Sequence, residues 1–304
     1  MNSASAHRNA ANSQDSVPQT VRGLQIKASR LTTGIFAGEY LSAFRGRGIE
    51  FEEVREYQPG DDVRTIDWNV TARLDRPYVK RFVEERELTI MILLDRSPSM
   101  QFGTRRATKL QTAVEAASLL AFAALRSNDK IGMITYTDRV ETFLPAAKGK
   151  RHVMRLIHQA LSAPSGSGGS GMEATLLQLG TVLKVRAQLF VISDFHDPIS
   201  LLPLAQTALR HDVVAVAVSD PTEMELPAIG LINLVDPETG SEYLVDSASS
   251  RVRDRYRRLA AIRHGQIRQQ LAAAGVEILN LNTSIAPLHP LIRFFRNRSR
   301  QRRG

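Results

Sequence analysis

The sequence contains no cysteine among its 304 residues, which excludes thiolate chemistry, cysteine-ligated zinc sites and disulfide scaffolds. Aromatic residues make up only 6% of the chain and include a single tryptophan. No apolar run approaches the roughly 18 residues that a membrane-spanning helix requires. The polar N-terminus also lacks the apolar region of a signal peptide. These absences predict a cytoplasmic protein without a transmembrane segment.

Positive charge is unevenly distributed along the chain. The formal net charge is +9, yet residues 251–304 contain 13 arginines and only two acidic residues, so the first 250 residues are close to neutral. The chain is therefore not basic throughout, as a general nucleic-acid binder would be. Residues 286–304 are predicted to form a basic C-terminal tail. This tail is either solvated and disordered, or in contact with an anionic surface of lipid, nucleic acid or an acidic protein.

The first 87 residues differ from the remainder. Residues 1–22 are polar and lack periodicity, which predicts disorder. Residues 23–87 are predicted to form a small β-rich segment, with a short helix near its start and two strands among charged residues. We expect Arg64, Asp67 and Trp68 in this segment to form a buried polar network that pins it to the following domain.

Buried strands alternate with helices from residue 88 to residue 285. Continuous apolar runs are typical of strands covered on both faces, and their alternation with helices predicts a mostly parallel α/β sheet with helices on both sides. A turn at 237–240 between two apolar patches predicts a hairpin over 231–246. The expected strands are 88–95, 130–137, 187–194, 212–220 and 276–281, and the expected helices are 108–126, 151–161, 175–184, 199–210 and 250–274.

Polar side chains follow several of the predicted strands where they end. In an open α/β sheet, ligands bind beyond the carboxyl ends of the strands. Hydroxyl and carboxylate oxygens are the donors that Mg²⁺ or Mn²⁺ prefers, and no cysteine or histidine cluster competes with them. We therefore expect an Mg²⁺ (or Mn²⁺) site whose open position is filled by a partner's carboxylate. The candidate ligands are Asp95, Ser97, Ser99, Thr175 and Asp194.

The Asp95-x-Ser97-x-Ser99 pattern after an apolar strand resembles the metal-ion-dependent adhesion site (MIDAS) of von Willebrand factor A domains. Upstream, RGRGIEFEEVREYQPGDDVRTIDWNVTARLDRPYVKRFVEERE (residues 45–87) resembles the signature of the family called domain of unknown function 58. That resemblance implies a von Willebrand factor A-like fold and a binding role beside a MoxR-type AAA+ ATPase. By the same resemblance, Thr175 and Asp194 match the later ligands of the site, with Ser170 as an alternative to Thr175.

Simpler interpretations of these residues also exist. Ser99 is suited to capping a helix, and an aspartate such as Asp194 is common at strand-to-helix turns. His196 is the only histidine near the site, and an ordinary hydrogen-bonded role is expected for it.

The leading functional prediction is a non-catalytic, metal-dependent protein-interaction module. It would act as an adaptor or chaperone-like partner of a MoxR-type AAA+ ATPase, with an acidic protein ligand completing the metal site. The alternatives are a Mg²⁺-dependent phosphohydrolase with Asp95 as nucleophile, and nucleic-acid or membrane-surface binding through the Arg-rich C-terminus. Against the enzyme, Ser97 stands where a second acidic residue is expected.

Overall fold

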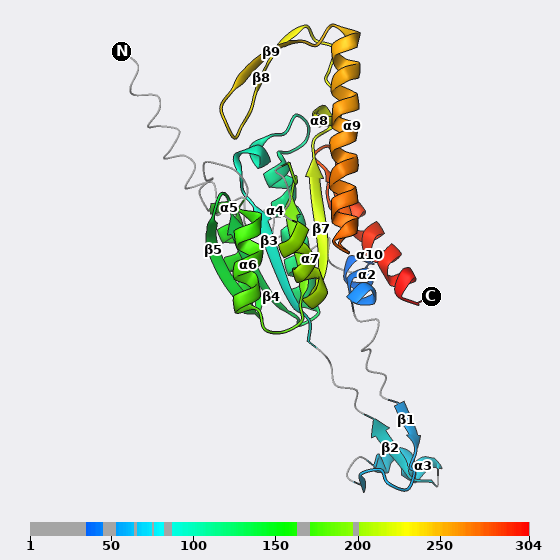
Figure 1. Cartoon of the computed structure of the whole chain (residues 1–304). Coiled ribbons are helices and arrows are strands. Elements are labelled where there is room, and N and C mark those ends of the chain that lie inside the picture. Colours follow the sequence, from blue (N-terminus) through cyan, green and yellow to red (C-terminus); the bar gives the residue numbers. More distant parts are fainter. Residues whose placement is uncertain are drawn as a thin grey trace.

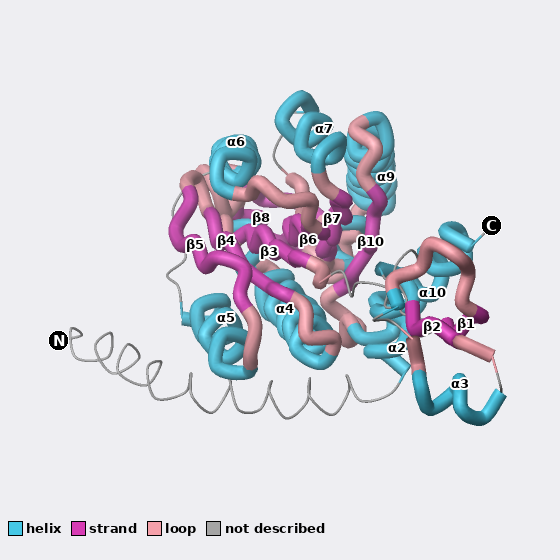
Figure 2. The backbone as a smooth tube through the Cα atoms, turned by 90° about the horizontal axis from the view of Figure 1, so that it is seen from below, coloured by secondary structure: helices cyan, strands magenta, loops and turns pink. Residues whose placement is uncertain are grey.

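A computed structural model describes residues 35–44, 53–63, 66–74, 76–81, 87–162, 171–196 and 201–303. The main body is a six-stranded sheet with helices on both faces, as the sequence predicted (Figures 1 and 2). No helix within the described ranges has both the length and the apolar character needed to cross a membrane. The predicted disorder of residues 1–22 lies outside the described residues.

The sheet has the strand order β10-β7-β6-β3-β4-β5, and all neighbouring pairs are parallel except β4 with β5. Its five parallel strands confirm the predicted ones. The antiparallel strand β5 was missed because it is a half-exposed edge strand that contains Pro145, a residue tolerated at sheet edges and irregularities. The strands are β3 (Thr89–Asp95), β4 (Lys130–Tyr136), β5 (Val140–Ala147), β6 (Gln188–Ser193), β7 (Asp212–Ser219) and β10 (Glu277–Asn282).

Helices cover the two faces of the sheet unequally. In Figure 2, α6, α7 and α9 lie on one face, while α4, α5, α2 and α10 lie on the other. Each face has its own buried apolar cluster, because the side chains of a buried strand alternate between the two sides. The helices are α2 (Ile35–Phe44), α4 (Lys109–Arg126), α5 (Lys150–Ser162), α6 (Met172–Val182), α7 (Leu201–Arg210), α8 (Pro221–Met224), α9 (Ser250–Ala273) and α10 (Leu288–Arg303).

Helix α4 lies deep in the body and begins beside the predicted site. Its start is fixed by a capping box, in which the Gln111 amide donates to the Thr108 hydroxyl at 3.1 Å and the Thr108 amide donates to the Gln111 side chain at 3.0 Å. The buried residues of α4 include six alanines, whose small side chains let the helix approach the sheet closely. This placement carries the first helical residue, Lys109, into the interior.

The C-terminal residues form a helix that belongs to the core, so the disordered tail considered from the sequence is wrong for the described part of this segment. Phe295 of α10 is fully buried and its ring contacts the rings of Phe36, Tyr40 and Phe44 on α2. Arg298 of α10 is also buried and pairs with Asp212 and Glu277. Helix α2 therefore packs with the main body.

A small antiparallel unit lies between α2 and β3 in the chain. It consists of β1 (Glu53–Glu56), α3 (Trp68–Leu74) and β2 (Tyr78–Arg81), with Glu53 opposite Arg81. The place expected for Trp68 in a buried network is wrong, because this side chain is 67% exposed. Asp67 accepts a hydrogen bond from the Val70 amide at the start of α3, and Arg64 lies outside the described residues, so a pairing of these two stays a prediction.

The predicted hairpin is present as β8 (Leu231–Val235) and β9 (Glu242–Asp246), which pair antiparallel. It follows α8 and precedes the long helix α9 (Figure 1). Most of its side chains are exposed, including Leu231, Tyr243 and Leu244. Its turn, in contrast, reaches the predicted site.

Candidate functional site

The candidate site lies at the point where the strand order of the sheet reverses. Strands β3 and β6 are neighbours in the sheet, yet the chain leaves β3 towards β4 and leaves β6 towards β7 in the opposite direction. Crevices that bind ligands in open α/β sheets form outside the carboxyl ends of strands at such a switch point. Asp95 ends β3, and Ser193 ends β6.

Three of the predicted ligands lie together after β3. The Ser97 amide donates to Asp95 Oδ1 at 2.9 Å, and the hydroxyl oxygens of Ser97 and Ser99 are 3.1 Å apart. All three residues are buried, and Ser99 lies in a short 3₁₀ turn, η2 (Pro98–Gln101). The chain thus places one carboxylate and two hydroxyl oxygens in one small region. The alternative that Ser99 caps a helix finds no support in this geometry, because Ser97 holds the N-cap position of η2 and makes no side-chain cap.

Ser193 was not recognised from the sequence as a member of this group. Its hydroxyl donates to Asp95 Oδ2 at 2.7 Å and accepts the Phe195 amide at 3.0 Å. Ser193 therefore orients Asp95 from the neighbouring strand. A polar residue directly after the apolar run Leu189–Ile192 was the signal that could have identified it.

Burial controls the electrostatics of Asp95. Desolvation raises the pKa of Asp95 to about 6, although the hydrogen bonds from Ser193 and Ser97 lower it and the charge of Asp194 raises it further. A buried carboxylate of this kind gains from a nearby cation, since an opposite charge favours its ionised form. Because a carboxylate offers about four lone-pair positions, two hydrogen bonds leave Asp95 free to ligate a metal ion.

Asp194 is held by a buried lysine. Lys109 Nζ lies 2.5 Å from Asp194 Oδ2 and 2.5 Å from Glu223 Oε1, and the Lys109 side chain is 1% exposed. Burial disfavours the charged forms of both groups, yet their mutual attraction outweighs it. The pKa of Asp194 is therefore lowered and that of Lys109 is raised. Lys109 is a fixed internal cation, and its signal in the sequence was a lysine at the start of an Ala-rich buried helix.

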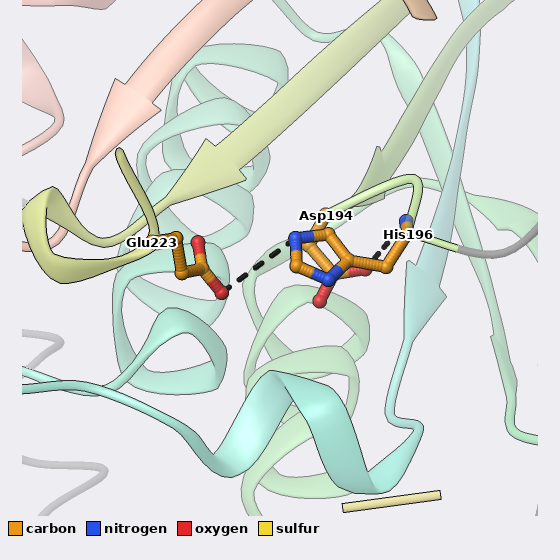
Figure 3. A group of neighbouring side chains, drawn as sticks. All are labelled: Asp194, His196 and Glu223. Carbon is orange, nitrogen blue, oxygen red and sulfur yellow. Dashed lines mark hydrogen bonds and ion pairs between the residues drawn. The ribbon is translucent and has the colours of Figure 1, made fainter. Parts of the chain in front are cut away.

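Asp194, His196 and Glu223 form a compact group of potential metal ligands (Figure 3). The His196 amide donates to Asp194 Oδ1 at 3.2 Å, and His196 Nε2 lies 3.6 Å from Glu223 Oε1. In the chain between Asp194 and His196, Phe195 has a φ of +54°, a left-handed conformation that is uncommon outside glycine. The ammonium of Lys109 already occupies the space between the two carboxylates. This group is therefore an ion-pair network beside the site. The His196 imidazole lies 3.6 Å from Glu223, beyond hydrogen-bonding distance, so the hydrogen-bonded role expected for this side chain stays a prediction.

The last predicted ligand, Thr175, is fully buried in α6. Its hydroxyl donates to the Gly171 carbonyl at 2.8 Å, within its own helix. Gly171 itself packs against the turn after β4, where an added Cβ would lie 2.7 Å from the Asp138 carbonyl carbon, so a side chain cannot be accommodated there. Ser170, the alternative ligand, lies outside the described residues. The direct ligand role of Thr175 thus stays a prediction.

A carboxylate from the hairpin also reaches the site. Glu238 lies in the turn between β8 and β9, and its Oε1 accepts the Ser99 amide at 3.1 Å. These two residues are 139 positions apart, and no local pattern signals their contact. Glu238 was not identified from the sequence.

The donor set fits Mg²⁺ or Mn²⁺. Asp95, Ser97 and Ser99 supply hard oxygen ligands, and a buried carboxylate with a raised pKa is the group that a cation would stabilise. Asp194 Oδ2 accepts a hydrogen bond from Lys109 Nζ, and its Oδ1 accepts one from the His196 amide. Both oxygens are thus engaged, which suits contact with the metal through a water molecule better than direct ligation.

Comparison with known proteins places this chain in a family. The profile described as "Protein of unknown function DUF58" matches residues 53–266. The uncharacterized proteins Rv1480 of Mycobacterium tuberculosis and Mb1516 of Mycobacterium bovis are each 34% identical over 286 residues, covering 92% of this chain and 89% of the relative.

Two solved structures resemble the fold in outline. The conserved hypothetical protein BatB from Bacteroides thetaiotaomicron is 17% identical, with a TM-score of 0.47 over 70% of this chain and 99% of its own. The SpRpn10 VWA domain is 13% identical, with a TM-score of 0.36 over 68% of this chain and 95% of its own. At these values neither likeness bears on what the chain binds. By its profile match and by relatives that it matches over most of their length, the chain belongs to the DUF58 family, and its fold is the mostly parallel α/β sheet with helices on both faces that the sequence predicted.

Proposed function

We propose that this chain is a non-catalytic protein-interaction module whose binding depends on Mg²⁺ or Mn²⁺. The observation that carries the proposal is the cluster of Asp95, Ser97 and Ser99 at the switch point of the sheet. With one carboxylate and neutral hydroxyls, this set leaves a bound divalent ion electron-poor. The ion would then supply a Lewis-acidic position for an acidic side chain of a partner protein.

The protein's own residues prepare this position. Ser193 and the Ser97 amide orient Asp95, while Lys109 holds Asp194 in its ionised form beside it. Burial of all these groups limits competition from water, which strengthens electrostatic attraction to an incoming carboxylate. We further propose that the partner is a MoxR-type AAA+ ATPase, and that the module acts as an adaptor. This part rests on the resemblance of residues 45–87 and of the Asp-x-Ser-x-Ser pattern.

The two alternative functions gain no support from the geometry. A phosphohydrolase with Asp95 as nucleophile would be expected to have a second acidic residue two positions on, where Ser97 stands. The nearby buried cation, Lys109, pairs with Asp194 and Glu223. For nucleic-acid binding, Phe295 is fully buried in the core and cannot stack on a base. A phosphatase screen with generic substrates would test the first alternative directly.

The proposal is tested with a double variant, Ser97→Ala with Ser99→Ala. Mn²⁺ binding is measured by calorimetry, and partner capture is measured with Mg²⁺ or with EDTA. We expect the variant to lose both while keeping its circular dichroism spectrum. Ser118→Ala is the matched control, because Ser118 is a buried serine whose hydroxyl donates to the Val114 carbonyl within its own helix. An ATPase recovered equally with Mg²⁺ and with EDTA, or an unchanged Mn²⁺ affinity in the double variant, would refute the proposal.

A further inference from the structure

The turn of the β8–β9 hairpin brings an acidic side chain of this chain to the predicted metal site. Glu238 is half-buried, and its Oε1 accepts the amide of Ser99, one of the predicted ligands. The position expected for a partner's carboxylate thus has a carboxylate of the chain itself beside it. The hairpin that carries it is otherwise mostly exposed.

The turn holds Glu238 in place through its own hydrogen bonds. Asp236 Oδ1 accepts the Glu238 amide at 2.9 Å, and the Asp236 amide donates to the Ser241 carbonyl at 2.8 Å. Gly240 closes the turn at a φ of +72°, which favours glycine. The side chain of Glu238 therefore projects from a preformed turn, so the backbone of the turn loses little conformational entropy when Glu238 contacts the site.

The hairpin is only lightly attached to the body. Strands β8 and β9 contact chiefly each other, and apolar side chains on both strands face solvent, among them Val235, Tyr243 and Leu244. The contact between Glu238 and Ser99 at the turn can break without unpacking the core. The hairpin can thus leave the site at a small cost in free energy.

We infer that Glu238 is the carboxylate that completes the predicted metal site in the free chain, and that an acidic partner binds by displacing it. This inference rests on the proposed function, because it requires the metal site of Asp95, Ser97 and Ser99. Mg²⁺ is typically held by one or two carboxylates, and Asp95 supplies only one. Glu238 supplies the second in the absence of a partner.

The decisive variant is Glu238→Gln. Glutamine keeps an oxygen that can accept the Ser99 amide but removes the charge, so it separates a metal ligand from a residue that only anchors the hairpin. Glu242→Gln is the matched control, since Glu242 is exposed on the same hairpin and accepts a hydrogen bond from Asn233. The probe is Mn²⁺ itself, titrated by calorimetry, together with hydrogen–deuterium exchange of residues 231–246.

We expect Glu238→Gln to weaken Mn²⁺ binding by at least about tenfold. Losing a residue that only hydrogen-bonds to a metal ligand usually weakens metal binding by that much or more, and losing a ligand should cost no less. Mn²⁺ should slow amide exchange across the hairpin in the wild-type chain and in the control, but not in Glu238→Gln. Saturating acetate should abolish this protection in the wild-type chain, because the two carboxylates compete. In Glu238→Ala, acetate should restore Mn²⁺ affinity.

The outcomes separate this inference from the proposed function. Equal Mn²⁺ affinity and equal hairpin protection in the wild-type chain and in Glu238→Gln would overturn the role of Glu238 and leave the metal site standing. Failure of the wild-type chain to bind Mn²⁺ would overturn the metal site and the role of Glu238 together.

Discussion

Replacing Asp220 tests how a single buried carboxylate stabilises the segments at the carboxyl ends of the strands. Its carboxylate is fully buried and accepts hydrogen bonds from three threonines in separate parts of the chain. Thr104 donates its amide at 2.8 Å and its hydroxyl at 2.6 Å, Thr222 donates its amide at 2.9 Å and its hydroxyl at 2.6 Å, and the Thr283 hydroxyl donates at 2.5 Å. One side chain thus ties the segment before α4, the start of α8 and the segment after β10 together.

The cost of Asp220→Asn follows from these contacts. The hydroxyl donors can rotate, but the amides of Thr104 and Thr222 cannot, and each bonds to a different oxygen of the carboxylate. An asparagine placed either way sets its NH₂ against one of these amides. A buried donor without an acceptor costs about 1–3 kcal/mol, and the remaining bonds lose the benefit of a charged acceptor. We expect a loss of about 3 kcal/mol in the free energy of unfolding at pH 7.

The measurement is urea or thermal denaturation of Asp220→Asn against the wild-type chain. A loss of this size should lower Tm by about 6 °C or more for a chain of this length. Asp246→Asn is the control, because Asp246 is exposed at the end of β9, and we expect it to change stability by less than about 0.5 kcal/mol.

The same comparison has a pH dependence of known sign. Burial opposes ionisation of Asp220, but the bonds from Thr104, Thr222 and Thr283 outweigh it, so its folded pKa lies below the usual value. Its stabilisation is therefore present above the unfolded pKa of about 3.9 and is lost as the pH falls further. The gap between wild type and variant should be constant from neutral pH to about pH 5 and then narrow. A gap below about 1 kcal/mol at pH 7 would contradict this reasoning.

Two further predictions concern the charges beneath the site. Lys109→Met should lower the free energy of unfolding, measured by urea denaturation, by about 3–5 kcal/mol, because it leaves Asp194 and Glu223 buried without their cation. The control, Lys184→Met at an exposed lysine, should leave this free energy nearly unchanged. A loss below about 1 kcal/mol in Lys109→Met would show that the ion pairs of Lys109 are not needed for stability. Burial raises the pKa of Asp95 in the folded chain to about 6, so at pH 8 its ionised form opposes folding by about 3 kcal/mol. In EDTA at pH 8, Asp95→Asn should therefore be at least as stable as the wild-type chain. The wild-type chain should gain stability as the pH falls from above 6 towards 4, and a pH-independent difference between the two would refute the assignment.

Four strands of the parallel sheet, β3, β4, β6 and β7, were predictable because each contains a largely continuous apolar run that ends in polar residues. Burial on both faces demands such a run, so β3 and β6 were located to within a residue or two. The edge strand β5 was not predictable in this way, since one side of it is exposed and Pro145 interrupts its pattern. Helix α10 was misjudged for a related reason: its many arginines suggest solvent, but one of them, Arg298, is buried against acidic partners and Phe295 enters the core.

The site was predictable only where its residues are local. Asp95, Ser97 and Ser99 follow one strand, so their spacing alone predicted that they lie together. Lys109 and Glu238 reach the same region from other elements, and their contacts depend on how helices and hairpins are placed around the sheet. A local sequence pattern does not indicate which residues distant in the chain come into contact. The geometry of α4 and of the hairpin had to be seen before either residue could be assigned a role.

The pairing of α2 with α10 has a consequence for how the chain is made. The aromatic side chains of α2 leave the ribosome early, but Phe295, which they contact, is synthesised about 250 residues later. At typical rates of translation this delay is roughly 12–50 s. During that time the rings of Phe36, Tyr40 and Phe44 lack the Phe295 ring that they contact in the finished fold. Completion of folding is thus tied to completion of synthesis, and a nascent chain that stops short of α10 would expose Phe36, Tyr40 and Phe44 to any chaperone or protease nearby.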